Sequence, residues 1–272
     1  MDIYTGDIIA MYSSPSYNPN LFLFGISQDE WQLIRNNPLK PLINKTLSGL
    51  YSPGSTIKPI VALSALENKV IDTKFKVKCT GKMELYGQTF HCWKEKGHGW
   101  VSLKNAMKQS CDTYFYEVAR LLGVDRLNIT AEKFGLGKKV LGDYFDNEKK
   151  GLFPNTKWKK NNLGKGWVLG ETLITGIGQG YTQTTPLQLC MMTAQIANGG
   201  FAVKPKIIVD SNPISYEDAK QSMESGLLFD TDSAELLDKK LFKNQKNIKI
   251  VQEAMFASTN ERFGTSYKSR ID

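Results

Sequence analysis

The sequence predicts a mixed α/β domain built around one buried helix, and three segments carry the prediction. Residues 55–68 are apolar almost all round a helix, which is typical of a helix at the centre of a domain. Residues 2–12 alternate around Thr5-Gly6-Asp7 and predict a β-hairpin. Residues 73–100 hold glycines, aromatic residues, two of the four cysteines and both histidines, which indicates irregular structure with short strands.

Further elements follow in chain order up to residue 170. Residues 20–50 predict loop and short helix. Residues 102–122 predict a helix broken near Ser110, and residues 125–135 predict another helix. Residues 140–170, rich in Lys, Asn and Gly, predict a long loop.

The last third of the chain holds a helix start at Thr185-Pro186. Thr185 is the cap, proline takes the first helical position, and Gln188 follows the cap by three residues, so we expect a helix to about Asn198 with Cys190 in the core. Three more segments follow, and their residue patterns predict a strand over residues 201–210 and helices over residues 232–240 and 245–260.

The composition limits the class of protein. The 272 residues suit one large domain or two small ones, and 35 basic against 27 acidic residues give a net charge of +8. A solvated basic face accounts for this charge, and attraction to an anionic membrane surface or an acidic glycan is the alternative. No nucleic-acid motif accompanies the lysines, so we expect no nucleic-acid partner. Asp2 follows Met1 with neither a basic nor an apolar region, so we expect no signal peptide. No stretch of the sequence approaches the roughly 18 apolar residues of a membrane span.

The pattern Ser55-Thr56-Ile57-Lys58 opens the apolar helix, directly after Pro53-Gly54. A serine hydroxyl needs a base within hydrogen-bond reach to act as a nucleophile. Because residues i and i+3 share a helix face, we expect Lys58 to lie over Ser55 and to take its proton. Backbone N–H groups at the helix N-terminus favour the negative charge that would develop there. The alternative is a helix-capping serine beside a solvated lysine.

The segment Ser52-Pro53-Gly54-Ser55-Thr56-Ile57-Lys58-Pro59 and the opening Met1-Asp2-Ile3-Tyr4-Thr5-Gly6-Asp7 resemble the class B penicillin-binding proteins, and the resemblance covers nearly the whole chain. This superfamily carries the motifs S-x-x-K, S-x-[ND] and K-[TS]-G. The resemblance implies an α/β penicillin-binding-protein transpeptidase fold, similar to the serine β-lactamases, with helices around an antiparallel sheet. It also implies a serine-type D,D-transpeptidase with Ser55 as nucleophile and Lys58 as its base.

Ser110-Cys111-Asp112 stands where the family has its second motif. In carrying Asp at the third position, the chain resembles the elongation-type group, penicillin-binding protein 2. The family's roles imply that Ser110 passes a proton between Lys58 and the leaving amine, and that Asp112 holds the lysine or the substrate by a hydrogen bond. Without the resemblance, a mid-helix serine and a capping aspartate are the default interpretation.

Cys79, Cys92, His98 and Cys111 are concentrated in one part of the sequence. Three thiolates and an imidazole suit a tetrahedral Zn²⁺ site, in which the ligand atoms lie about 3.3–4 Å apart. The elongation-type group is similar in having a zinc site of mixed ligands beside the second motif, so we expect a structural zinc ion and no catalytic cofactor. Three alternatives stay open: a Cys79–Cys92 disulfide, an inert buried Cys111, and His91 in place of His98.

The third motif of the family, K-[TS]-G, does not occur in residues 1–272. In the family its strand binds the substrate carboxylate and gives an oxyanion N–H. We therefore expect residues 1–272 to form a partial transpeptidase domain that lacks the membrane anchor, the N-terminal pedestal and the K-[TS]-G strand. We also expect this polypeptide to bind penicillin poorly by itself.

The resemblance implies a function in the cell wall. The parent enzyme would cross-link peptidoglycan stem peptides that end in D-Ala-D-Ala during cell elongation, at the periplasmic face of the bacterial inner membrane. It would react with β-lactams and work with a membrane glycosyltransferase. Two other classes of function stay open, a penicillin-recognising sensor domain that uses the same nucleophile, and a non-catalytic interaction module stabilised by zinc.

Overall fold

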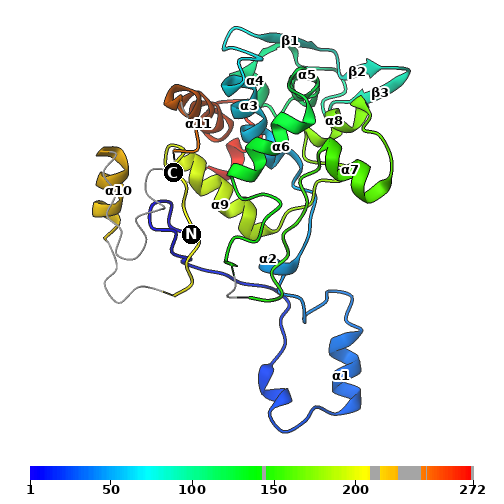
Figure 1. The fold of residues 1–272 in the computed structure, drawn as a ribbon, viewed down its shortest axis with the longest axis vertical. Helices are drawn as coiled ribbons and strands as arrows, with labels where there is room; N and C mark the ends of the chain where they lie inside the picture. The colour runs from blue at the N-terminus through cyan, green and yellow to red at the C-terminus, as the bar shows by residue number, and fades with distance from the viewer. Residues whose placement is uncertain (143–144, 209–214, 226–239, 243, 271–272) are drawn as a thin grey trace.

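The computed structural model describes residues 1–142, 145–208, 215–225, 240–242 and 244–270. Helices form most of the described fold, and the short strands lie together at one end of it, at the top of Figure 1. None of the helices in these ranges combines the length and the hydropathy that crossing a bilayer requires.

The centre of the fold is the helix that the sequence predicted. A 3₁₀ turn, η2 (Gly54–Ile57), leads directly into α3 (Lys58–Glu67), and the helix is buried on all sides as its composition requires. It contacts α4 (Leu103–Lys108), α5 (Asp112–Leu122), α6 (Val124–Lys133) and α11 (Gln245–Asn260), which surround it in Figure 1.

The predicted break near Ser110 is confirmed. α4 ends at Lys108, Ser110 adopts a left-handed φ of 51°, and α5 begins at Asp112. A non-glycine residue in this region is uncommon, and it turns the chain sharply between the two helices. The consequence is that Ser110 and Asp112 are presented at a corner, close to the first turn of α3.

The strands of residues 73–100 are short, as predicted. They are β1 (Lys76–Cys79), β2 (Lys82–Leu85), β3 (Gln88–His91) and β4 (Gly99–Ser102). β1 pairs antiparallel with β4, and β2 pairs antiparallel with β3, so the strands form two separate two-stranded sheets. The register sets Cys79 opposite Gly99, next to His98, which brings two distant parts of the sequence together.

The helix after Thr185 is also confirmed. α9 (Pro186–Ala197) begins with the expected capping box, because the side chains of Thr185 and Gln188 each bond the other's backbone N–H. The prediction that Cys190 lies in the core is wrong, because Cys190 is exposed on this helix.

The long loop predicted over residues 140–170 is wrong in part. It contains α7 (Thr156–Leu163), and α8 (Leu169–Thr175) begins at its end. The Asn155 side chain caps α7, and the helix ends at Gly164 with a left-handed φ of 63°. Lys159 is buried and pairs with Glu171, so a contact between two helices stabilises a segment whose composition is typical of a loop.

The hairpin predicted over residues 2–12 is wrong as well. The Asp2 carboxylate accepts the N–H groups of Tyr4 and Thr5, and this local bonding forms a turn in place of a ladder. Asp7 forms a single parallel bridge to Lys206, and Phe201 bridges Lys240. The described part of residues 201–210 is therefore held by isolated bridges and is not a strand.

The remaining helices include a projecting arm. The short helices η1 (Pro19–Phe22) and α1 (Gln28–Arg35) extend away from the body at the bottom of Figure 1, and α2 (Lys45–Ser48) returns the chain to it. α10 (Tyr216–Ser225) and η4 (Tyr267–Ser269) complete the described elements. The predicted helix 245–260 is confirmed as α11, and residues 232–239 of the other predicted helix lie outside the described residues.

Candidate active site

Ser55 is exposed in the 3₁₀ turn η2, one turn before the α-helix on which the sequence placed it. The turn is fixed by a hydrogen bond from Gly54 N to Gly178 O at 2.9 Å. Gly178 has a φ of 73°, and a Cβ atom there would lie 2.2 Å from Gly54 O, so this approach requires glycine. Gly178 therefore packs against the backbone that presents the Ser55 hydroxyl.

Lys58 is buried at the first residue of α3, with 1% of its surface exposed. Its Nζ donates to Ser110 O at 2.9 Å, to Ser110 Oγ at 3.0 Å and to Asp112 Oδ1 at 2.7 Å. An ammonium group has three donors and no acceptor, so each donor has a partner. The Phe115 ring lies beneath it, with Nζ 5.4 Å from the ring centroid. A buried positive charge is thus neutralised and fully hydrogen-bonded.

A row of hydrogen bonds joins the buried amine to the exposed hydroxyl. Lys58 Nζ donates to Ser110 Oγ, and Ser110 Oγ donates to Ser55 Oγ at 3.0 Å. The sequence predicted direct contact between Lys58 and Ser55, but Ser110 Oγ stands between them. The physical reason is that the carbonyl and hydroxyl of Ser110, with the Asp112 carboxylate, already take all three donors of the amine.

Trp93 contacts this site, and the sequence did not indicate it. Its backbone N–H donates to Asp112 Oδ2 at 3.0 Å. Its indole Nε1 donates to Gln109 O and to Ser110 O, both at 3.0 Å. The signal that could have found it is its place directly after Cys92 in the sequence, because Cys92 and Cys111 of the second motif are both predicted ligands of one site.

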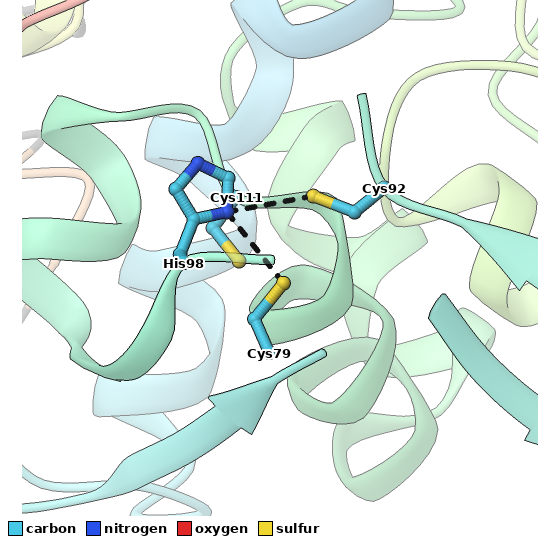
Figure 2. Close-up of side chains that lie close together, drawn as sticks. All are labelled: Cys79, Cys92, His98 and Cys111. Atoms are coloured by element: carbon cyan, nitrogen blue, oxygen red, sulfur yellow. Dashed lines mark hydrogen bonds between the residues drawn. The ribbon is translucent and has the colours of Figure 1, made fainter. Parts of the chain in front are cut away.

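The cysteine and histidine side chains predicted as metal ligands converge (Figure 2). One ligand atom from each of Cys79, Cys92, His98 and Cys111 lies within 4.8 Å of the others. His98 Nδ1 is 3.5 Å from Cys79 Sγ and 3.6 Å from Cys92 Sγ, within the expected range for zinc ligands. All three cysteines of the group are free and buried, so the disulfide alternative is wrong in this structure.

The chemistry of this cluster fits a metal ion. The Cys111 thiol donates to Cys92, which lowers the pKa of Cys92, while the same bond and burial raise the pKa of Cys111. A thiolate is the form that binds zinc. Cys111 is fully buried in the core, and its sulfur lies within the group. His91 is exposed in β3 and stands outside the group, so the alternative that His91 replaces His98 is also wrong in this structure.

The two sites are adjacent in the chain. Cys111 lies between Ser110 and Asp112, and Cys92 precedes Trp93. Ser110 and Asp112, which accept from the Lys58 amine, and Trp93, which bonds to both of them, are thus each next to a cysteine of the cluster. Holding the thiols in place would hold the backbone of the hydrogen-bonded row.

Comparison with known proteins gives three findings of similarity. Residues 1–269 match the penicillin binding protein transpeptidase domain. The peptidoglycan D,D-transpeptidase MrdA of Acinetobacter baumannii is 42% identical over 210 residues, which are 76% of this chain and 31% of that protein. The structure of Pseudomonas aeruginosa PBP2 in complex with WCK 5153 is similar with a TM-score of 0.84 at 38% identity, over 98% of this chain and 58% of that one.

A further solved structure is the complex between PBP2 and MreC from Helicobacter pylori. It is similar with a TM-score of 0.82 at 32% identity, over 99% of this chain and 46% of that one. The chain spans 31% to 58% of the length of these relatives.

The buried ion pair yields a prediction about stability. Lys58→Met keeps the bulk of the side chain but leaves the Asp112 carboxylate, which is 13% exposed, without its cation. We expect the free energy of unfolding to fall by about 3–5 kcal/mol, measured by urea denaturation. Lys82→Met is the matched control, since it removes the partner of Glu84 from an exposed pair and should leave the stability unchanged. An equal loss in both variants would contradict the role of the buried charge.

Proposed function

Because the chain belongs to the penicillin-binding protein transpeptidase family and has its fold, we propose that it acts as a serine-type D,D-transpeptidase of the bacterial cell wall. The observation that carries the proposal is the hydrogen-bonded row Lys58–Ser110–Ser55. An exposed hydroxyl that is joined through a second hydroxyl to a buried amine suits acyl transfer. The amine can take and return a proton without contacting the substrate.

The first half of the proposed reaction forms an acyl-enzyme. Ser55 Oγ attacks the carbonyl carbon of the bond between two terminal D-alanines. This step requires Lys58 in its neutral form, with one proton released from the ammonium and the two hydrogen bonds of the row reversed. As the O–C bond forms, the Ser55 proton then moves to Ser110 Oγ, and the Ser110 proton moves to the Lys58 amine. The Asp112 carboxylate then stabilises the buried ammonium.

The C–N bond of the substrate then breaks. The proton returns along the same row to the leaving nitrogen, and D-alanine departs while Ser55 carries the acyl ester. An amine of a neighbouring stem peptide attacks this ester and gives up a proton, and Ser55 Oγ regains one as it leaves. A β-lactam would acylate Ser55 in the same way by opening its ring.

The substrates and partners follow from the same proposal. The acyl donor is a peptidoglycan stem peptide that ends in D-Ala-D-Ala, and β-lactams are the inhibitors. The reaction takes place at the periplasmic face of the inner membrane during cell elongation, beside a membrane glycosyltransferase. Similarity to MrdA, and to a PBP2 solved in complex with MreC, supports this assignment.

We propose that the cysteine cluster holds a structural zinc ion. Cys79, Cys92, His98 and Cys111 would be its ligands, and the donor set, the burial and the free thiols support this. Four protein ligands fill a tetrahedral site, so zinc bound there supplies cross-linking of the chain and no activated water. Its contribution to the reaction is to fix Cys111 and thereby the backbone of Ser110 and Asp112.

The nucleophile is tested by covalent labelling with a fluorescent penicillin. In the parent enzyme that also carries the K-[TS]-G strand, we expect Ser55→Ala to abolish labelling and Lys58→Ala to reduce it nearly as far, because the effects of replacing groups that act as one unit do not add. Ser52→Ala changes an exposed serine of the same segment and should label normally. Labelling of Ser55→Ala at the unmodified rate would refute the assignment.

The metal is tested by elemental analysis together with thermal unfolding. We expect about one zinc ion per chain. Cys92→Ser should lower the metal content, lower the melting temperature by about 3–10 °C, and slow acylation. Cys190→Ser changes the exposed cysteine outside the cluster and serves as the control. Purified protein without zinc, or a Cys92→Ser variant as stable as the control, would end the zinc proposal.

A further inference from the structure

Trp93 is bound to the acyl-transfer site at both of its N–H groups. The backbone N–H donates to the Asp112 carboxylate, and the indole N–H donates to the carbonyl groups of Gln109 and Ser110. We infer that Trp93 is a positioning residue that holds Ser110 and Asp112 in place for Lys58. The inference deepens the proposed function and rests on it.

Trp93 and Lys58 share their acceptors. Asp112 presents Oδ1 to Lys58 Nζ at 2.7 Å and Oδ2 to Trp93 N at 3.0 Å. The Ser110 carbonyl accepts from Lys58 Nζ at 2.9 Å and from Trp93 Nε1 at 3.0 Å. Two of the three acceptors of the catalytic amine are therefore also held by Trp93. Movement of either acceptor would stretch bonds to both residues.

The segment that Trp93 bonds needs such support. Ser110 has a left-handed φ of 51°, a conformation that is strained for a residue other than glycine. The carbonyls of Gln109 and Ser110 follow the end of α4, where carbonyl groups lack helical partners. α5 also begins without a side-chain cap at Cys111. The indole N–H supplies a donor to two carbonyl groups that have no helical partner.

The Trp93 ring is also held by a contact with His98. The indole of Trp93 packs edge-on against the His98 ring, with the centroids 5.4 Å apart. Trp93 is 58% exposed, so burial of its ring does not explain its orientation. The N–H points inward to the two carbonyls while much of the ring faces solvent. Trp93 thus connects the cysteine cluster, through its neighbour Cys92 and its contact with His98, to the groups that accept hydrogen bonds from Lys58.

The test removes the indole N–H and keeps an aromatic ring. In Trp93→Phe we expect the rate constant of acylation by a fluorescent penicillin to fall about tenfold, the effect of losing one hydrogen bond to a strained carbonyl. The apparent dissociation constant for the penicillin, the zinc content and the melting temperature should stay unchanged. Trp100→Phe is the control, because Trp100 is 68% exposed on the neighbouring strand β4 and makes no side-chain hydrogen bond in the described structure.

A second variant tests whether the effect of Trp93→Phe comes from the lost N–H group or from a change in packing. Replacing the Trp93 side chain by 3-benzothienylalanine, which has the shape of tryptophan but no N–H, should slow acylation as much as Trp93→Phe. Unchanged acylation in both variants, or a loss that follows zinc content, would overturn the inference.

Hydrogen exchange separates this inference from the proposed function. Ser110 N and Cys111 N bond to the carbonyls of Met107 and Ala106, and we expect both amides to exchange about tenfold faster in Trp93→Phe and at the normal rate in Trp100→Phe. If the unmodified parent enzyme is not acylated, the proposed function fails, and the exchange rates alone decide whether Trp93 holds this segment. Equal exchange in the two variants would show that it does not.

Discussion

The ion pair between Lys58 and Asp112 is the interaction on which the rest of the site depends. A charge with only 1% of its residue exposed is tolerated because three acceptors surround it. That requirement brings together the first turn of α3, the corner between α4 and α5, and the segment after β3. It also explains why Ser110 adopts a left-handed conformation, since this conformation lets its carbonyl and its hydroxyl face the same amine. The exposed Ser55 is then connected to a buried base by a single bridging hydroxyl.

The cysteine cluster and the serine–lysine site form one structural unit. Cys111 is the residue between Ser110 and Asp112, and Cys92 directly precedes Trp93. The four side chains gather from β1, from the segment that links β3 to β4, and from the start of α5. An ion bound there would cross-link these segments, so the geometry of the proton row and the stability of the strand region would change together. The proposed function assigns two separate roles, in which the thiols hold the backbone in place and the hydroxyls and the amine carry the proton.

Local patterns in the sequence predicted the parts of the fold that depend on local physics. The apolar composition of residues 55–68, the break at Ser110 and the capping box at Thr185 each correspond to an observed feature. The predictions were wrong where other contacts in the folded chain determine the local structure. α7 depends on the burial of Lys159 against Glu171, and the Asp2 carboxylate replaces a predicted hairpin by a turn. For the site, motif spacing and resemblance named the residues that converge, but they missed the bridging position of Ser110 and the contacts of Trp93. Both depend on the geometry of the corner between α4 and α5, which the spacing of residues in a motif does not predict.

The central claim is that the Ser55 hydroxyl, at the end of the row from Lys58, is the acyl acceptor. The most direct measurement is to treat the parent enzyme, which also carries the K-[TS]-G strand, with a β-lactam, digest it, and locate the adduct by tandem mass spectrometry. The account predicts one adduct of the mass of the intact β-lactam, on Ser55, because opening of the lactam ring loses no atoms. An adduct on another residue, or none under conditions in which the protein is folded and contains its metal, would contradict the account.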